Sequence, residues 1–248
     1  MAGLDELKVK IFADGADLEE IRRLYSTNPL IKGYTTNPTL MRKAGIDDYE
    51  RFGRAALAAV PDRPVSLEVF ADELDEMVAQ GLTIASWGKN ANVKVPVMNT
   101  KGTYCGPAIA RLAQGGVLVN VTAIMTAAQV KAVARDLNPE VPAIVSVFAG
   151  RIADAGIDPE TVMRDCKNAL EGHPQAELLW ASPREVFNIF QADKVGCGII
   201  TVSNDILAKL GTVGKDLDEY SLETVKMFHR DATAAGYDIR VAESATAE

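Results

Sequence analysis

The sequence predicts an α/β fold of the (β/α)8 class, a closed TIM barrel in which each of eight parallel strands is followed by a helix. Three observations favour it. Short runs rich in β-branched residues alternate with longer amphipathic stretches along the whole chain. The chain has 248 residues, close to the roughly 250 that such barrels typically need. No glycine-rich phosphate-binding turn follows the first strand, which disfavours the alternative of an open, doubly wound sheet.

The strands are expected at the short apolar runs, because parallel strands are buried on both faces and read as nearly continuous hydrophobic segments. Helix-length patterns separate these runs, so consecutive strands are joined by right-handed crossovers. In chain order, the predicted strands are Lys8–Ala13, Lys32–Thr35, Pro64–Glu68, Asn92–Val95, Val117–Val121, Ala143–Val147, Leu178–Ala181 and Gly198–Thr201.

Helices are predicted where apolar residues recur at intervals of three and four. Thr126 is suited to capping one of them, and Pro159 is suited to the first turn of another. Glycines at positions 115, 116 and 172 are expected to end helices before the next strand begins. The clearest helical patterns cover Asp17–Ser26, Tyr104–Ala113, Thr126–Leu137 and Pro159–Leu170.

An additional C-terminal helix is predicted over Asp216–Ala235, beyond what eight units require. Its apolar residues include Leu222, Val225 and Phe228. The pattern leaves open whether this helix packs on its own barrel or on a neighbouring subunit. The whole chain, residues 1–248, is predicted to be a single domain, with a polar and frayed tail over about 236–248.

Composition excludes several classes of function. The net charge of −8 argues against a nucleic-acid partner, because phosphate backbones attract basic surfaces. The N-terminus lacks the apolar core of a signal peptide, and no apolar run has the length of a membrane span, so we expect a cytoplasmic protein without a membrane partner. Cys105, Cys166 and Cys197 are scattered, so neither a disulfide framework nor a metal site is expected.

Lys94 is the most informative residue, because valines flank it within the predicted strand Asn92–Val95. Its side chain is therefore expected in the interior or wall of the barrel. Burying an ammonium is costly unless it is paired or deprotonated. Desolvation lowers the pKa of a lysine, and a neutral amine is a nucleophile for carbonyl groups. The alternative is a lysine whose stem follows the strand and whose ammonium reaches solvent.

Polar side chains also occur at the ends of the other predicted strands, where barrel enzymes place their functional residues. Carboxylates, amides and hydroxyls around one amine supply what proton transfer on a polyol requires. Each residue also has a structural alternative: Asp14 can cap the next helix, and Thr122 can be an ordinary strand residue. The expected polar set is Asp14, Asn37, Glu68, Asn120, Thr122, Ser146 and Ser182, and Phe148 follows Ser146 on the same face.

Two arginines follow the sixth and seventh predicted strands, Arg151 and Arg184. A guanidinium at the mouth of a barrel is suited to bidentate capture of a phosphate group. The alternative is a pair of surface arginines that form ion pairs with Asp154 and Glu185. The residues alone leave these two interpretations open.

Two segments resemble signatures of the transaldolase family of class I, Schiff-base aldolases. The turn Thr35-Thr36-Asn37-Pro38 resembles its TTNP-type signature, and Asn92-Val93-Lys94-Val95-Pro96 resembles its Schiff-base lysine segment. The resemblance runs from the strand that ends at Asp14 to the eighth unit, nearly the whole chain. It implies a transferase of carbohydrate metabolism in the pentose phosphate pathway, with sugar phosphates as substrates and no cofactor.

The resemblance also implies a role for each matching residue. Lys94 attacks the ketose carbonyl and Asp14 takes the proton from the hydroxyl beside the cleaved bond. Glu68 and Thr122 hold a water that carries protons during imine formation and hydrolysis. The substrate-binding residues are Asn37, Asn120 and Ser146 for the hydroxyls of the dihydroxyacetone unit, Arg151, Ser182 and Arg184 for the phosphate, and Phe148 for the pocket wall.

The expected activity is transfer of dihydroxyacetone from sedoheptulose 7-phosphate or fructose 6-phosphate to an aldose phosphate. The alternatives are a fructose-6-phosphate aldolase, which releases dihydroxyacetone, and a barrel that binds a sugar phosphate without catalysis. In the short-chain aldolase branch, glutamine tends to replace Glu68 and tyrosine tends to replace Phe148. These two residues and Asn120 resemble the transaldolases, whereas the chain length resembles the short branch.

The resemblance also bears on the oligomeric state and on the position of one arginine. A homo-oligomer is expected, because short-branch relatives form pentamers and decamers and longer transaldolases are often dimers. One departure from the family lies after the seventh strand, where Pro183 precedes Arg184 in place of the more usual aromatic residue. This proline puts the position of Arg184 in doubt.

Overall fold

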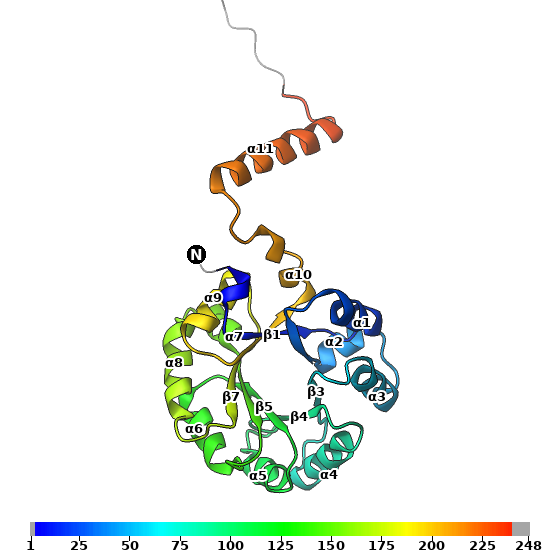
Figure 1. The fold of residues 1–248 in the computed structure, drawn as a ribbon, viewed down its shortest axis with the longest axis vertical. Coiled ribbons are helices and arrows are strands. Elements are labelled where there is room, and N and C mark those ends of the chain that lie inside the picture. The colour runs from blue at the N-terminus through cyan, green and yellow to red at the C-terminus, as the bar shows by residue number, and fades with distance from the viewer. Residues whose placement is uncertain (1–2, 240–248) are drawn as a thin grey trace, which may run out of the picture. The chain divides into compact units, whose positions relative to one another are not determined.

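A closed barrel of eight parallel strands forms the larger part of the molecule, as the sequence predicts (Figure 1). The computed structural model describes residues 3–239, which divide into a barrel unit, residues 4–210, and a C-terminal unit, residues 211–239. Each strand pairs with the next one along the chain, and β8 closes the ring on β1. The alternative of an open sheet is therefore wrong.

The observed strands agree with the predicted ones to within three residues at each end. The largest difference is in β5, which continues beyond the predicted end at Val121 and therefore includes Thr122. The strands are β1 (Lys10–Asp14), β2 (Ile31–Thr35), β3 (Val65–Glu68), β4 (Ala91–Pro96), β5 (Val119–Ile124), β6 (Ala143–Val147), β7 (Ala176–Trp180) and β8 (Ile199–Ser203).

The helices of the barrel unit form a ring outside the strands (Figure 1). Each predicted helix is present, and shorter helices lie in the connections between some strands. They are α1 (Leu18–Thr27), α2 (Pro38–Lys43), α3 (Tyr49–Ala59), α4 (Leu74–Ala85), α5 (Gly106–Gln114), α6 (Ala127–Asp136), α7 (Ala149–Asp154), α8 (Pro159–Ala169), α9 (Phe187–Lys194) and α10 (Asn204–Leu207), with a short 3₁₀ turn at Leu4–Glu6. A second 3₁₀ turn, Leu210–Thr212, begins at the last residue of this unit.

Local sequence signals explain where several of these helices begin. Thr126 caps α6 and forms a reciprocal capping box with Gln129. Pro159 occupies the first turn of α8 behind its cap, Asp158. Asn37 caps α2, and its side-chain oxygen accepts a hydrogen bond from the amide of Leu40. The TTNP-type turn thus has a structural role, since it starts a helix directly at the end of β2.

The interior of the barrel contains a small apolar cluster formed by Phe12, Ile144, Leu179, Ala181 and Ile199. We call this cluster the floor. Phe12 needs Gly33 beside it, because a Cβ at Gly33 would lie 2.6 Å from the Phe12 ring. The floor separates a cavity at the carboxyl ends of the strands from a second cavity, lined by Lys10, Lys32 and Asn92 among others, at their amino ends.

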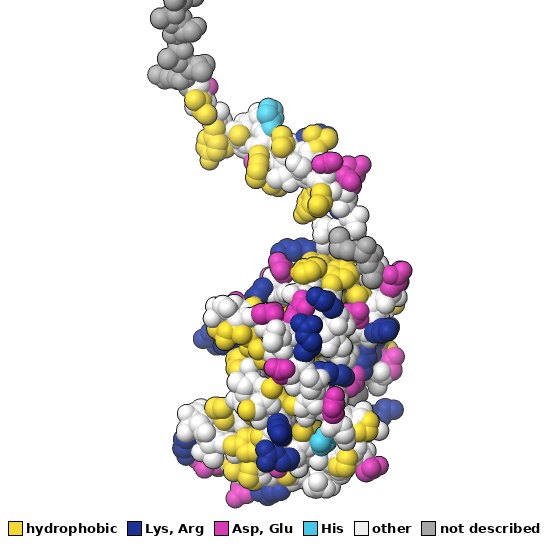
Figure 2. Space-filling view, turned by 90° about the vertical axis from the view of Figure 1, so that its left-hand side faces the viewer, with side chains coloured by type: hydrophobic (Ala, Val, Ile, Leu, Met, Phe, Trp, Pro, Cys, Tyr) yellow, Lys and Arg dark blue, Asp and Glu magenta, His cyan; other side chains and the backbone are white. Residues whose placement is uncertain are grey.

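The C-terminal unit contains the additional helix that the sequence predicts, α11 (Leu217–Ala234). None of its residues is buried, and Leu222, Val225 and Phe228 are each more than half exposed. Figure 2 shows hydrophobic side chains along this helix. Most of the predicted tail, residues 240–248, lies outside the described residues. Within residues 3–239, no helix is both long and apolar enough to cross a membrane.

Candidate active site

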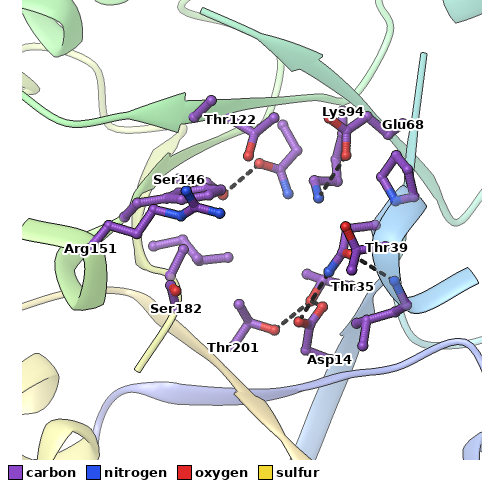
Figure 3. Close-up of a pocket in the computed structure, with 18 residues that line it drawn as sticks. Asp14, Thr35, Thr39, Glu68, Lys94, Thr122, Ser146, Arg151, Ser182 and Thr201 are labelled. Atoms are coloured by element: carbon purple, nitrogen blue, oxygen red, sulfur yellow. Dashed lines mark hydrogen bonds and ion pairs between the residues drawn. The ribbon is translucent and has the colours of Figure 1, made fainter. Parts of the chain in front are cut away.

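A cavity of about 450 Å³ opens at the carboxyl ends of the barrel strands. Alternate residues of a strand point to the same side, so one row of positions on every strand faces the barrel interior. All eight strands contribute to the lining, which is polar above the floor (Figure 3). The strand residues that line it are Asp14, Thr35, Glu68, Lys94, Asn120, Thr122, Ala123, Ser146, Leu179 and Thr201.

Lys94 lines this cavity and is 7% exposed. Its ammonium donates a hydrogen bond of 2.8 Å to the carbonyl oxygen of Thr36 and lies 3.2 Å from Oε2 of Glu68. The register explains the ion pair, because Lys94 and Glu68 are direct partners on the adjacent strands β4 and β3. The ammonium is therefore inside the barrel, and the alternative of a solvent-exposed head does not apply.

Asp14 ends β1 on another side of the cavity from Glu68 (Figure 3). Burial raises the pKa of its carboxyl group, and the charge of Lys94 and a hydrogen bond from Thr35 act in the opposite direction. The Thr35 hydroxyl donates to Oδ1 at 2.7 Å, and the Asn37 amide lies 3.4 Å from Oδ2. A carboxylate whose pKa is raised in this way can both accept and return a proton.

Asn120, on β5, is fixed in orientation by two serines, one on β3 and one on β6. Its Nδ2 donates to Oγ of Ser66 at 3.0 Å, and its Oδ1 accepts from Oγ of Ser146 at 2.6 Å. All three side chains are buried. Thr122, two residues further along β5, has a buried hydroxyl with no hydrogen-bond partner among residues 3–239. Thr122 is one of the residues that line the cavity, and a buried hydroxyl without a protein partner is suited to a hydrogen bond with a water or ligand.

Two residues of the cavity wall have left-handed backbone conformations that are uncommon outside glycine. Ala123 has φ of 62° and Ser182 has φ of 60°. Ala123 lies where the pairing of β5 with β6 shifts register. Such bulges and strained residues concentrate at functional sites, where they direct neighbouring side chains. Here the register shift at Ala123 lies directly after Thr122 in β5.

Arg151 supplies a cation to the cavity wall (Figure 3). Its guanidinium carbon lies 5.5 Å from the centre of the Phe148 ring. It forms no ion pair within the described part of the chain, so its charge is not already neutralised by a carboxylate. A guanidinium held over an aromatic ring at the rim of a cavity is suited to binding an anionic group.

Arg184 is placed differently, because it does not line the cavity. Its guanidinium is paired with Asp154 through both Nε and Nη2. The loop before it runs close to α7, where a Cβ at Gly150 would overlap the carbonyl oxygen of Ser182. The surface ion pair with Asp154 is the arrangement that the sequence left open as the alternative for this arginine.

The structure brings ten of the eleven expected site residues into one cavity, and Arg184 lies outside its lining. The lining also includes residues outside the expected set, among them the strand threonines Thr35 and Thr201. Threonine is common in strands, so its presence there carried no signal. The alternation of side chains along each strand was a usable signal, since Thr35 and Thr201 occupy the interior row.

The fold and this cavity together define a (β/α)8-barrel protein with its polar site at the carboxyl ends of the strands. Comparison with known families agrees with this class. The sequence pattern described as Transaldolase/Fructose-6-phosphate aldolase matches residues 11–240. The chain belongs to this family.

Curated relatives support the same assignment. The chain is 34% identical over 209 residues to a probable transaldolase of Streptococcus agalactiae. The match covers 82% of this chain and 90% of the relative. It is 33% identical over 205 residues to a probable transaldolase of Dehalococcoides mccartyi, with the same coverage. It is 34% identical over 219 residues to a probable transaldolase of Herpetosiphon aurantiacus, covering 87% of this chain and 92% of that one.

Proposed function

We propose that the chain is a transaldolase, which transfers a dihydroxyacetone unit from a ketose phosphate to an aldose phosphate through a Schiff base on Lys94. The observation that carries the proposal is a buried amine, 3.2 Å from the Glu68 carboxylate, in one cavity with the separate carboxylate Asp14. The curated relatives described above are named as probable transaldolases. Sedoheptulose 7-phosphate and fructose 6-phosphate are the donors we expect.

Imine formation uses the Lys94 side of the cavity. The Lys94 ammonium transfers a proton to Glu68, and the neutral amine then attacks the ketone carbon of the sugar. As the carbon–nitrogen bond forms, the nitrogen gives up one proton and the carbonyl oxygen gains one, which yields the neutral carbinolamine and leaves Glu68 protonated. The carbinolamine hydroxyl then leaves as water, with a proton returned by Glu68, and a protonated imine remains. The free hydroxyl of Thr122 is suited to orienting the water that leaves and later returns.

Carbon–carbon cleavage uses Asp14. Its carboxylate takes the proton from the hydroxyl on the far carbon of the bond to be broken, and that oxygen becomes the carbonyl oxygen of the departing aldose phosphate. The electrons of the broken bond move into the protonated imine, which becomes a neutral enamine. The imine is therefore the electron sink of the reaction.

Transfer to the acceptor reverses these steps. The enamine carbon attacks the aldehyde of the acceptor, and Asp14 returns its proton to the new hydroxyl. Water then adds to the imine carbon, and the carbinolamine releases the product ketose and the free amine of Lys94. Glu68 again accepts and returns the protons of this hydrolysis. Protons and electrons balance over the full cycle.

The remaining polar side chains bind the substrate in this proposal. The amides of Asn37 and Asn120 and the hydroxyl of Ser146 bind the hydroxyls of the dihydroxyacetone unit. Arg151 and the Ser182 hydroxyl bind the phosphate, because Arg151 is the cavity-lining guanidinium and has no carboxylate partner within residues 3–239. Arg184 joins the phosphate site only if it leaves its pair with Asp154.

The proposal is tested by borohydride reduction in the presence of fructose 6-phosphate. Reduction should fix a three-carbon unit irreversibly on Lys94, which peptide mass spectrometry detects, and Lys94→Met provides the control. No mass gain on this lysine would reject the Schiff-base mechanism. It would leave the sugar-phosphate-binding barrel as the surviving interpretation.

Turnover measured with and without an acceptor aldose distinguishes the transferase activity from the competing lyase activity. A transaldolase should consume fructose 6-phosphate rapidly only when erythrose 4-phosphate is present. Equal turnover with and without the acceptor would identify an aldolase. Glu68 and Phe148, which both line the cavity, are the residues that favour transfer.

We also propose that the protein is a homo-oligomer in which α11 packs against another copy of the chain. The helix has 18 residues, none buried, with exposed apolar side chains at Leu222, Val225 and Phe228. An exposed apolar stripe of this kind marks an interaction surface. Light scattering should show an assembly that Phe228→Asp dissociates, and a monomeric parent protein would contradict the proposal.

A further inference from the structure

Two threonine hydroxyls, those of Thr35 and Thr201, connect Asp14 on β1 to the neighbouring strand β8. The Thr35 hydroxyl donates to Oδ1 of Asp14 at 2.7 Å, and the hydroxyl oxygens of Thr35 and Thr201 are 2.5 Å apart. Thr35 ends β2 and Thr201 lies within β8, so the two strands that flank β1 supply the chain. Figure 3 shows both threonines beside Asp14.

The direction of donation follows from the number of hydrogens. An ionised carboxylate only accepts, and each threonine hydroxyl has one hydrogen to donate. The Thr35 hydrogen points to Asp14, so the Thr201 hydrogen points to Thr35. Both threonines are buried, with exposed fractions of 3% and 7%, and linked hydrogen bonds in such surroundings strengthen one another.

The two oxygens of Asp14 therefore have different surroundings. Oδ1 is held by Thr35 at 2.7 Å, whereas the contact that the structure gives Oδ2 is the longer one, 3.4 Å, with the Asn37 amide. A carboxylate oxygen that accepts a short hydrogen bond is a weaker base than one whose hydrogen bond is longer. Oδ2 is accordingly the oxygen available to a hydroxyl in the cavity.

We propose that Thr201 is a positioning residue that acts through Thr35 to hold the Asp14 carboxylate, so that Oδ2 is the atom that takes the substrate proton. This inference rests on the proposed function, since it assigns Asp14 the role of general base. It adds a residue on β8 whose effect on the reaction is indirect. Thr201 borders the cavity, but its hydrogen is directed to Thr35 and away from a bound sugar.

The electrostatic surroundings make the effect measurable. The charged groups that act on Asp14 are Lys94, which lowers its pKa, and Glu68, which raises it. The Thr35 hydrogen bond lowers the pKa as well. Weakening the chain should raise the pKa of Asp14, and because the base must be ionised, the acidic limb of the kcat/KM profile should move to higher pH.

The experiment compares Thr201→Val, Thr35→Val and the double variant in the full-length protein. At neutral pH, kcat/KM for the ketose should fall about tenfold in Thr35→Val and about threefold in Thr201→Val, as expected for hydrogen bonds to a charged group and to a neutral one. In the double variant, kcat/KM should match that of Thr35→Val alone, because Thr201 then has no route to Asp14. Thr201→Ser keeps the hydroxyl and should restore the parental pH profile.

A second readout separates positioning from a general structural role. Dihydroxyacetone forms an imine without carbon–carbon cleavage, so borohydride trapping of this sugar on Lys94 reports imine formation alone. Trapping should proceed at the parental rate in Thr201→Val while ketose turnover falls. The inference is overturned by multiplicative effects in the double variant, by an unchanged pH profile in Thr201→Val, or by parallel loss of trapping and turnover. Failure of the parent protein to be trapped would instead reject the proposed function.

Discussion

The two carboxylates of the cavity differ in what holds them. Glu68 is paired directly with the Lys94 ammonium at 3.2 Å, and the backbone carbonyl of Glu68 accepts a 2.8 Å hydrogen bond from the Tyr49 hydroxyl. Asp14 is held by neutral donors, a hydroxyl on Oδ1 and an amide near Oδ2. A carboxylate in contact with an amine is suited to exchanging protons with that amine. One held by neutral groups remains available to the substrate.

The comparison therefore divides the proposed reaction between two sides of one cavity. The Glu68 side, built on β3 and β4, serves the formation and hydrolysis of the imine. The Asp14 side, built on β1, β2 and β8, serves the making and breaking of the carbon–carbon bond. Lys94 is the one residue that both sides require.

The largest effect is expected from Lys94→Ala. Without the amine neither half of the reaction can begin, so turnover should fall by at least about a thousandfold. Steady-state assay with fructose 6-phosphate and erythrose 4-phosphate measures the loss. Circular dichroism should show an intact fold, because removing a buried cation leaves Glu68 as a partly exposed carboxylate. Residual activity near the parental level would show that Lys94 has no covalent role.

The division between the sides is sharpened by comparing Asp14→Asn with Glu68→Gln. Both remove one carboxylate with little change of shape. Asp14→Asn should lower ketose turnover by about a hundredfold or more while dihydroxyacetone is still trapped on Lys94. Glu68→Gln should slow the trapping itself, by about tenfold or more. Equal effects of both variants on trapping would contradict the division.

The two arginines provide a comparison of smaller size. Arg151→Ala should raise KM for phosphorylated sugars by about tenfold or more, with kcat changed less, because it removes a charged contact made in both the bound and transition states. Arg184→Ala should change KM by less than about threefold, since that guanidinium is already neutralised by Asp154. Competition by inorganic phosphate gives an independent measure. A larger effect at Arg184 would show that it leaves Asp154 when substrate binds.

The smallest effect concerns stability and its dependence on pH. Burial raises the pKa of Asp14 above its unfolded value, so ionisation of this group opposes folding. This destabilisation is absent below the pKa of the unfolded state, near 3.9. It reaches its full size once the pH exceeds the raised pKa of the folded state. Asp14→Asn should therefore be more stable than the parent at pH 7, and this gain should vanish towards pH 3. Urea denaturation at the two pH values measures it, and a gain independent of pH would contradict the cause.

The sequence predicts the barrel well because its periodic signals are local. Eight apolar runs, each followed by a helical pattern, specify strand number and order without knowledge of any contact. Lys94 is equally accessible to prediction, since a lysine between valines is unusual in a buried strand. The end of β5 was harder to place, because the left-handed conformation of Ala123 has no signal in an alanine.

The parts of the site that could not be predicted depend on contacts between distant segments. Arg184 lies in the loop before α9 and outside the cavity lining, where it pairs with Asp154 at the end of α7. The path of the intervening loop depends on the missing side chain at Gly150. Thr201 gains its proposed role only because closure of the barrel places β8 beside β1. Such pairings follow from three-dimensional closure and leave no trace in local patterns.

The floor of the barrel has a consequence for the order of events. Phe12, packed against the bare backbone of Gly33, and its apolar neighbours close the inner end of the cavity. Sugars therefore enter and leave at the carboxyl ends of the strands, where the cavity opens. In the proposed reaction, the aldose released in the first half leaves from this end before the acceptor binds. The kinetics should therefore be ping-pong, with the two aldoses competing for one form of the enzyme.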